Sequence, residues 1–332
     1  MYNMHSILRY KVLYYNNGVA QLSQVLYTIF MTVKQFLFIV EIRTKIVSVS
    51  TFLLALSYTL WTTGSVPLHL VILTFIAALF VDMGTTGFNS YFDWYHNVDD
   101  PKFNKEDAKV IIHEGVSPGS ALIASIACWM VAFVPGVIIT VMRGLPVIAI
   151  GAVCLLVGFF YSAGKRPISF TPWGEFFAGG FLGTVFFVLC NYIFTGTFSE
   201  KAFLVSLPQS FSIAAILSTN NACDFDGDKA AGRKTLAILA GKKLSPYIIY
   251  TLEFLWLISL FMLTAFKYLP GIVLPLATIV AVIVSHELYS MHIRGYTHAT
   301  KGPNMGSISK IFLLETAGIL ASFALDFFVF RS

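Results

Sequence analysis

Long continuous runs of apolar residues dominate the chain and are separated by shorter polar stretches. Nine runs approach the ~20 residues that a helix needs to cross a hydrocarbon core. Because apolar residues follow one another instead of alternating, the pattern predicts helices and argues against barrel strands. The predicted spans are residues 46–61, 68–91, 121–140, 145–161, 176–194, 202–220, 244–266, 269–285 and 308–330.

The composition places the chain in lipid. Apolar residues make up 57% and charged residues 12%, and the mean hydropathy is +0.76, outside the range of ordinary soluble domains. We therefore expect an all-α membrane protein with about nine transmembrane helices in residues 41–332. The first 30 residues mix Tyr and Asn with basic residues, so we expect residues 1–40 to form an N-terminal extension at the membrane interface.

Basic residues are distributed unequally between the two membrane faces. Eighteen of the 22 Lys and Arg residues fall on the face that carries the N-terminus and the connections after the even-numbered helices. The positive-inside rule places this face in the cytoplasm, and we expect a multi-pass protein of a bacterial cell membrane. This asymmetry and anionic lipid account for the net charge of +5 without a nucleic-acid partner. The sequence gives no evidence of an obligatory protein partner.

Three connections on the predicted cytoplasmic face are long and polar: residues 93–119, 224–243 and 286–309. We expect them to form cap loops over a site at this face. The first follows the second span and the next follows the sixth span, which predicts two parallel four-helix halves and an added ninth helix.

The first polar cluster begins where the second span ends. Asn89, Asp93 and Asn97 are separated by steps of four residues, and Asp99 and Asp100 follow. Residues four apart lie on one face of a helix, so the first two aim their oxygen atoms in one direction. Alone, this segment is equally compatible with an Asp-rich turn.

A second cluster closes the sixth span. Asn220, Asp224 and Asp228 again stand at four-residue steps, and Arg233 and Lys234 follow. Carboxylates at the end of a membrane helix are costly, and clusters of oxygen ligands suit a hard cation such as Mg²⁺. The two clusters together predict a metal-bound anion at the cytoplasmic face.

A third polar segment ends the fourth span. Tyr161 and Lys165 share a helix side if the helix continues that far, and Arg166 follows. Beside the two carboxylate clusters, this segment is a candidate clamp for a diphosphate. Arg43, at the start of the first span, is a candidate for an acceptor carboxylate, although a basic residue there is also an ordinary membrane flank.

Other polar and small residues have simpler interpretations. We interpret the four cysteines as packing residues and the histidines at 286, 292 and 298 as polar loop residues, because their spacing does not fit a zinc pair. Gly179 and Gly183 match a close-packing pair of membrane helices.

The chain resembles the UbiA-type intramembrane aromatic prenyltransferases. That family carries Asn/Asp-rich motifs on its second and sixth helices and Tyr-x3-Lys on its fourth, in a nine-helix fold. The resemblance runs from about residue 41 to the C-terminus and is specific because three motifs agree in order and place. The matching motifs are Asn89-x3-Asp93, Tyr161-x3-Lys165 and Asn220-x3-Asp224-x3-Asp228.

The resemblance implies a role for each candidate residue. Two Mg²⁺ ions would clamp the diphosphate of a polyprenyl donor, whose departure leaves an allylic carbocation for an aromatic acceptor to trap. The implied metal ligands are Asn89, Asp93, Asn220, Asp224 and Asp228. The implied catalytic residues are Asp93, Asp224, Tyr161 and Lys165. The implied substrate-binding residues are Lys165, Arg166, Arg233, Lys234, Arg43 and Asn97.

Within the family, the chain looks most like the menaquinone branch, which prenylates 1,4-dihydroxy-2-naphthoate with loss of carbon dioxide. Residues 88–93, 173–177 and 232–237 support this interpretation. A strict first motif has Asp where this chain has Asn97, so Asp99 or Asp100 is a candidate to complete the first metal shell. Hydroxybenzoate, homogentisate and haem remain alternative acceptors.

Two other functions match parts of the sequence. The stretch from Asp226 to Ala230 superficially resembles a lipid-alcohol phosphotransferase motif, but Ala231 stands where that motif needs Arg. A cation-coupled transporter is the non-enzymatic alternative, because membrane carboxylates and a possible repeat are common in transporters. The clustering of carboxylates at one face, away from the midplane, argues against it.

Overall fold

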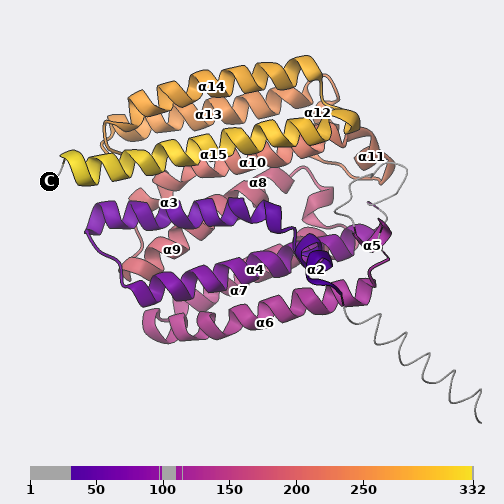
Figure 1. The fold of residues 1–332 in the computed structure, drawn as a ribbon, viewed down its shortest axis with the longest axis horizontal. Helices are drawn as coiled ribbons and strands as arrows, with labels where there is room; N and C mark the ends of the chain where they lie inside the picture. Colours follow the sequence, from indigo (N-terminus) through magenta and orange to yellow (C-terminus); the bar gives the residue numbers. More distant parts are fainter. Residues whose placement is uncertain (1–30, 97, 99–109, 114, 331–332) are drawn as a thin grey trace, which may run out of the picture.

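The computed structural model describes residues 31–96, 98, 110–113 and 115–330, and these residues form helices and short connections (Figure 1). The helices are α2 (Val33–Ile39), η1 (Ile42–Lys45), α3 (Ile46–Thr63), α4 (Leu68–Tyr95), α5 (Val110–His113), α6 (Pro118–Arg143), α7 (Leu145–Ser162), η2 (Ile168–Phe170), α8 (Gly174–Gly179), η3 (Gly180–Val185), α9 (Phe186–Thr195), α10 (Glu200–Cys223), α11 (Phe225–Ala230), α12 (Leu236–Ala240), α13 (Ser245–Ala265), α14 (Val273–Arg294), η4 (His298–Thr300), α15 (Lys301–Leu325) and η5 (Asp326–Phe330).

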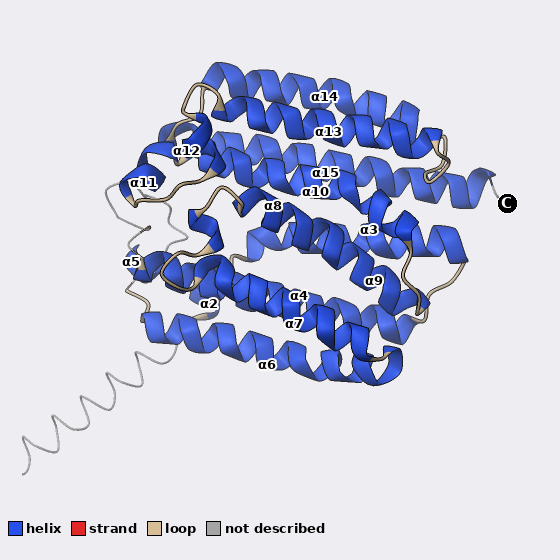
Figure 2. Cartoon of the chain, turned by 180° about the vertical axis from the view of Figure 1, so that it is seen from behind, coloured by secondary structure: helices blue, strands red, loops and turns tan. Residues whose placement is uncertain are grey.

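The prediction of an all-α membrane protein is confirmed. Among the described residues, nine helical segments are long and apolar enough to cross a membrane, and no strand is present (Figure 2). The fifth span joins α8, η3 and α9 into one segment with a π-helical turn in the middle. These segments satisfy their backbone hydrogen bonds internally, as a lipid environment requires.

The third predicted cap loop is wrong. Residues 286–309 are mostly helical, because α14 continues to Arg294 and the last span already begins at His298. Polar residues do not interrupt these helices because they pair across the α14–α15 contact. Arg294 donates to Asn304 Oδ1 at 3.0 Å and to Ser307 Oγ at 2.7 Å. His286 and His292 consequently lie in α14 and not in a loop.

Helices that follow one another pack in antiparallel pairs. α4 lies against α6, α10 against α13, and α14 against α15, while α15 also packs on α3 (Figures 1 and 2). The predicted close contact at Gly179 and Gly183 is confirmed, since a Cβ on either residue would clash with Ser210 of α10. Small residues thus allow the fifth and sixth spans to approach closely.

The short helices mark one end of the bundle. α5, α11 and α12 lie beside the C-terminal ends of α4 and α10, and the chain ends at the opposite end (Figure 1). α2 packs over α4, α5 and α6; Ile39 belongs to one buried apolar cluster with Val110 and Ala121, and the following Val40 to another with Met83. The predicted extension therefore includes a described helix that covers the bundle, whereas residues 1–30 lie outside the described part.

Candidate functional site

A large cavity connects the two Asn/Asp motifs with the apolar interior. Its volume is about 2260 Å³, and its wall is formed by α3, α4, α6, α7, α9, α10 and the segments around them. Asp93 and Asp224 line it at the end that carries the short helices, whereas Val147 and Ile193 line it near the other end. The cavity is therefore polar at one end and mostly apolar along the bundle.

The first motif reaches the cavity from the last turns of α4. Asn89 and Asp93 both line the cavity. Asn89 Oδ1 accepts a hydrogen bond of 2.6 Å from Ser162 Oγ at the end of α7. The helical spacing of four residues thus puts both side chains on one face, as the sequence predicts. Asn97, Asp99 and Asp100 lie outside the described residues.

The second motif keeps its register although α10 ends inside it. Asn220 lies in the last turn of α10, Asp224 caps the helix, and Asp228 lies in α11. The backbone N–H of Asp224 donates to Asn220 O and that of Asp228 donates to Asp224 O, each at 2.9 Å. All three residues line the same cavity as the first motif.

Arg233 links the two motifs electrostatically. Its Nη1 lies 2.8 Å from Asp228 Oδ1, and its Nη2 donates to Ser169 O at 3.1 Å. Burial disfavours the charged guanidinium, but the carboxylates of Asp228 and Asp93 outweigh this effect and raise the pKa of Arg233. Carboxylates from both halves of the bundle therefore act on one cation at the cavity wall.

Two residues that the sequence analysis did not assign to the site contact Asp224. Lys301 Nζ lies 2.6 Å from Asp224 Oδ2, and His298 Nδ1 lies 3.4 Å from Oδ1. Both come from the start of the last span, which the sequence analysis placed in a loop. Their basic character on the predicted cytoplasmic face was the available signal, but it did not separate them from ordinary flanking residues.

The third motif reaches the site only in part. Tyr161 lines the cavity, and Gly174 brings the α8 backbone close to its hydroxyl. α7 ends at Ser162, and Gly164 adopts a positive φ of 96°, so Lys165 does not share a helix face with Tyr161.

The remaining predicted cations differ in position. Lys165, Arg166 and Lys234 are exposed and do not line the cavity, whereas Arg43 is exposed and does line it. The role of the first three in binding diphosphate stays a prediction.

A buried pair supports the wall behind Tyr161. Asn221 Nδ2 donates to Glu175 Oε1 at 2.9 Å, and both residues are buried between α8 and α10. Glu175 directly follows Gly174, whose backbone lies close to the Tyr161 hydroxyl. Glu175 is thus a buried acid beside the site, and neither of its oxygen atoms lines the cavity.

The donor set fits a metal that is shared with a substrate anion. Asp228 is 3% exposed, and its Oδ2 has no hydrogen-bond partner. Among the described residues, no three His, Cys, Asp or Glu side chains gather closely enough to hold a metal alone. Mg²⁺ is usually bound by one or two carboxylates together with substrate phosphates and water. The residues therefore fit Mg²⁺ as part of a complex with an anion.

Proton competition should make Mg²⁺ binding depend on pH. Burial raises the pKa of Asp228 to about 6, and the Arg233 charge only partly offsets it. Below this pH the carboxyl carries a proton that a metal must displace. We expect the apparent Mg²⁺ affinity to fall up to about tenfold per pH unit below 6 and to be nearly constant above 7. Mg²⁺ titrations between pH 5 and 8 test this dependence, and an equally steep dependence above pH 7 would contradict it.

Comparison with solved structures supports the fold. A UbiA homologue from Archaeoglobus fulgidus bound to DMAPP and Mg²⁺ superposes with a TM-score of 0.60 over 88% of this chain and 99% of its own, at 16% identity. A structure of digeranylgeranylglyceryl phosphate synthase gives a TM-score of 0.60 at 18% identity, over 87% and 98% of the two chains. At these low identities, the TM-scores establish a shared fold.

Relatives in sequence point in the same direction. The chain is 31% identical over 196 residues to 1,4-dihydroxy-2-naphthoate octaprenyltransferase of Bacillus subtilis, covering 57% of this chain and 63% of that enzyme. It is 28% identical over 230 residues to UbiA prenyltransferase domain-containing protein 1 of Danio rerio, covering 68% and 66%. The matches span just under two thirds of each relative. The model of the UbiA prenyltransferase family matches residues 48–305, more than half of the chain, and the chain therefore belongs to the UbiA prenyltransferase family.

Proposed function

We propose that this protein transfers a polyprenyl group from an allylic diphosphate to an aromatic acceptor in a Mg²⁺-dependent reaction. One observation carries the proposal: Asn/Asp motifs from two separate helices meet Arg233 at the polar end of one long, mostly apolar cavity. This arrangement suits a ligand with an anionic head and an apolar tail. The Archaeoglobus fulgidus homologue, which binds DMAPP and Mg²⁺, supports an allylic diphosphate as that ligand.

We assign the metal-binding role to the five oxygen donors that line the polar end. Asn89 and Asp93 would hold one Mg²⁺, and Asn220, Asp224 and Asp228 a second. Bound Mg²⁺ would neutralise the departing diphosphate, which is its main chemical contribution. Arg233 and Lys301 would supply further positive charge, and Tyr161 a hydroxyl donor, to the same leaving group.

The apolar part of the cavity has two tasks. Side chains such as Ile139, Val147 and Ile193 would accommodate the prenyl tail, which has no polar group to satisfy. Trp129 and Phe177 also line the cavity, and their ring faces would stabilise an allylic cation while water is excluded. The carbocation would then meet the acceptor ring before it meets water.

We further propose 1,4-dihydroxy-2-naphthoate as the acceptor, which places the enzyme in menaquinone biosynthesis. The Bacillus subtilis relative is named for this substrate, and Arg43 at the cavity wall offers a cation for its carboxylate. The ring carbon that bears the carboxylate forms a bond to the allylic carbon as the C–O bond to diphosphate breaks. Loss of carbon dioxide from the ring then returns its electron pair and restores aromaticity, so this route needs no protein base.

The orientation follows from the distribution of basic residues. The polar end of the cavity lies at the end of the bundle to which the sequence pattern assigns 18 of the 22 Lys and Arg residues, and we place this end in the cytoplasm. The diphosphate would then reach the site from the aqueous side, while its tail enters from the lipid.

An acceptor panel tests the proposal directly. Purified protein is incubated with Mg²⁺, a polyprenyl diphosphate and dihydroxynaphthoate, hydroxybenzoate, homogentisate or haem, and products are identified by mass. We expect prenylated naphthalenediol, diphosphate and carbon dioxide from the first acceptor, and none when Mg²⁺ is chelated. If another acceptor were prenylated instead, that compound would replace dihydroxynaphthoate as the proposed acceptor. Cation uptake into proteoliposomes without turnover of any acceptor would favour a transporter.

A further inference from the structure

A buried carboxylate lies inside the cavity away from the Asn/Asp motifs. Asp82 precedes Asn89 by seven residues on α4, which is two helical turns or about 10 Å. Steps of seven and eleven residues return to nearly the same side of a helix, so Asp82, Asn89 and Asp93 form one stripe. All three line the cavity, and none of the roles proposed above uses Asp82.

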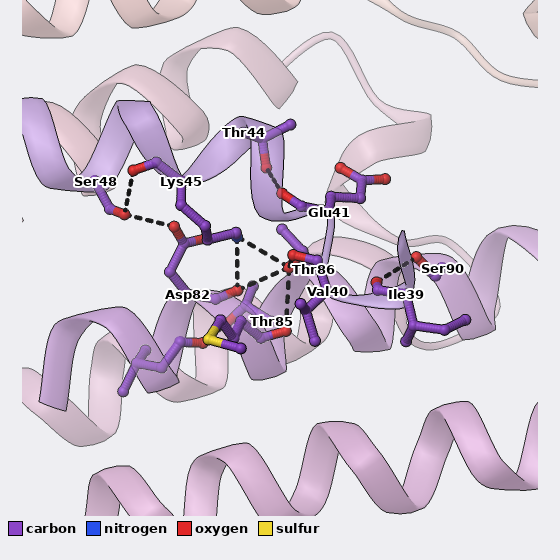
Figure 3. Close-up of polar contacts among 12 residues, drawn as sticks. Ile39, Val40, Glu41, Thr44, Lys45, Ser48, Asp82, Thr85, Thr86 and Ser90 are labelled. Carbon is purple, nitrogen blue, oxygen red and sulfur yellow. Dashed lines mark hydrogen bonds and ion pairs between the residues drawn. The ribbon is translucent and has the colours of Figure 1, made fainter. Parts of the chain in front are cut away.

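A network of hydrogen bonds fixes the Asp82 carboxylate (Figure 3). Lys45 Nζ lies 2.6 Å from Asp82 Oδ1, and Ser48 Oγ donates to Asp82 Oδ2 at 2.6 Å. The same ammonium donates to Thr86 Oγ1 at 3.0 Å and to Asp82 O at 3.3 Å. The side chains of Lys45 and Asp82 are only 5% and 11% exposed.

Within this network, Asp82 can still form hydrogen bonds with a further group, whereas Lys45 cannot. The three N–H groups of Lys45 are used by Asp82 and Thr86, so Lys45 has none left for a substrate. Each oxygen of Asp82 receives one hydrogen bond and can receive another. Lys45 and Ser48 thus hold a carboxylate that faces the cavity and offers it hydrogen-bond acceptors but no donor.

The charges of the two substrates decide which of them offers that donor. The diphosphate of the donor is an anion and would be repelled by Asp82, and a prenyl tail has no polar group. An acceptor with ring hydroxyls carries the needed O–H. Resting on the proposed function, we propose that Asp82 accepts a hydrogen bond from a ring hydroxyl of the acceptor and thereby fixes how the ring faces the allylic carbon.

The position of Asp82 fits this role. It lies two turns from Asn89, on the apolar side of the predicted diphosphate site, where the acceptor ring must meet the first carbon of the prenyl chain. The wall of the same cavity includes Ala78, Trp129 and Ala132, which can pack against a ring. Asp82 is therefore a positioning and specificity residue that acts on the acceptor and not on the leaving group.

The test compares Asp82→Asn with the wild type on dihydroxynaphthoate and on each of its two mono-O-methyl ethers. A hydrogen bond to a charged group contributes enough to raise the acceptor KM about tenfold to a hundredfold when the charge is removed. The KM for the polyprenyl diphosphate and the Mg²⁺ requirement should stay unchanged. For the wild type, one of the two methyl ethers should have a much higher KM than dihydroxynaphthoate. For the variant, the KM of this ether should be no higher than that of dihydroxynaphthoate.

Removing Asp82 alone leaves the Lys45 ammonium buried without its partner, which can impair folding. The double variant Lys45→Met/Asp82→Asn removes both charges, and we expect it to fold and to show the same acceptor defect. Asp326→Asn is the matched control, because that carboxylate accepts from Trp61 Nε1 at 2.7 Å and does not line the cavity. This control should keep the wild-type acceptor KM.

Acceptor binding is also measured without turnover, from quenching of Trp fluorescence by dihydroxynaphthoate and its ethers. A wild type that binds the acceptor through Asp82 but transfers no prenyl group would support this inference and overturn the proposed function. The inference would be overturned if the Asp82 variants lost affinity for the polyprenyl diphosphate as much as for the acceptor. It would also be overturned if both variants still discriminated against the same ether as the wild type does.

Discussion

Asp93→Asn and Asp228→Asn should each lower kcat/KM for prenyl transfer by roughly 10³-fold, the scale seen when a group that stabilises leaving-group charge is lost. Each substitution keeps the shape of the side chain but removes its negative charge, which is what a Mg²⁺–diphosphate complex needs. The two residues come from α4 and α11 and line the same cavity. A loss of activity in each of the two variants would show that one site is built from both halves of the chain.

The folded state should survive both substitutions, because membrane insertion depends on apolar length. Elution from size-exclusion chromatography and the Tm in detergent check this point. Glu287→Gln is the control, because this carboxylate pairs with Lys310 at 2.7 Å and does not line the cavity. We expect this control to stay within about twofold of the wild type, as is usual for exposed pairs. Full activity of both test variants, or an equal loss in the control, would refute the metal assignment.

The spans were predictable because lipid imposes a simple rule on sequence. A helix that crosses the hydrocarbon core needs about 20 apolar residues, and each predicted run contains the centre of an observed span. The ends were less predictable. The α14–α15 connection is short because Arg294 pairs with Asn304 and Ser307, and a linear pattern does not show which polar residues will satisfy one another.

The spacing of the motifs predicted the oxygen donors of the candidate site but not its cations. Four-residue steps fix which side chains share a helix face, so Asn89, Asp93, Asn220 and Asp224 line the cavity as expected. The cations around them depend on tertiary structure. Lys301 reaches Asp224 from a helix more than 70 residues later in the chain, whereas Lys165 follows the end of α7 and points elsewhere. No local pattern distinguishes these two lysines.

Asp82 carried a signal that the sequence analysis did not use. A charged residue within an apolar span is costly and therefore marks a function or a buried partner. The partner, Lys45, lies 37 residues away on another helix. Only the fold therefore shows that the donors of Lys45 are all used by Asp82 and Thr86 while Asp82 lines the cavity.

Arg233→Met should lower kcat/KM by about 10²-fold, since charge-assisted contacts to a leaving group typically contribute this much or more. Two losses combine in this variant. The diphosphate loses a cationic donor, and Asp228 loses the partner that now lies 2.8 Å away. Without that partner the buried carboxyl becomes easier to protonate, so Mg²⁺ must compete with a proton over a higher pH range.

Arg233→Lys and Lys234→Met separate these effects from a general loss of positive charge. Lysine keeps the charge but not the fork that bonds Asp228 and Ser169 together, so we expect an intermediate activity. Lys234 is the next residue, but it is exposed and outside the cavity wall, and its removal should change kcat/KM by less than about twofold. Steady-state rates over a range of Mg²⁺ concentrations measure all three variants. If Lys234→Met lost as much activity as Arg233→Met, the diphosphate would have to bind nearer the surface than the buried carboxylates, and the assignment of Arg233 would be wrong.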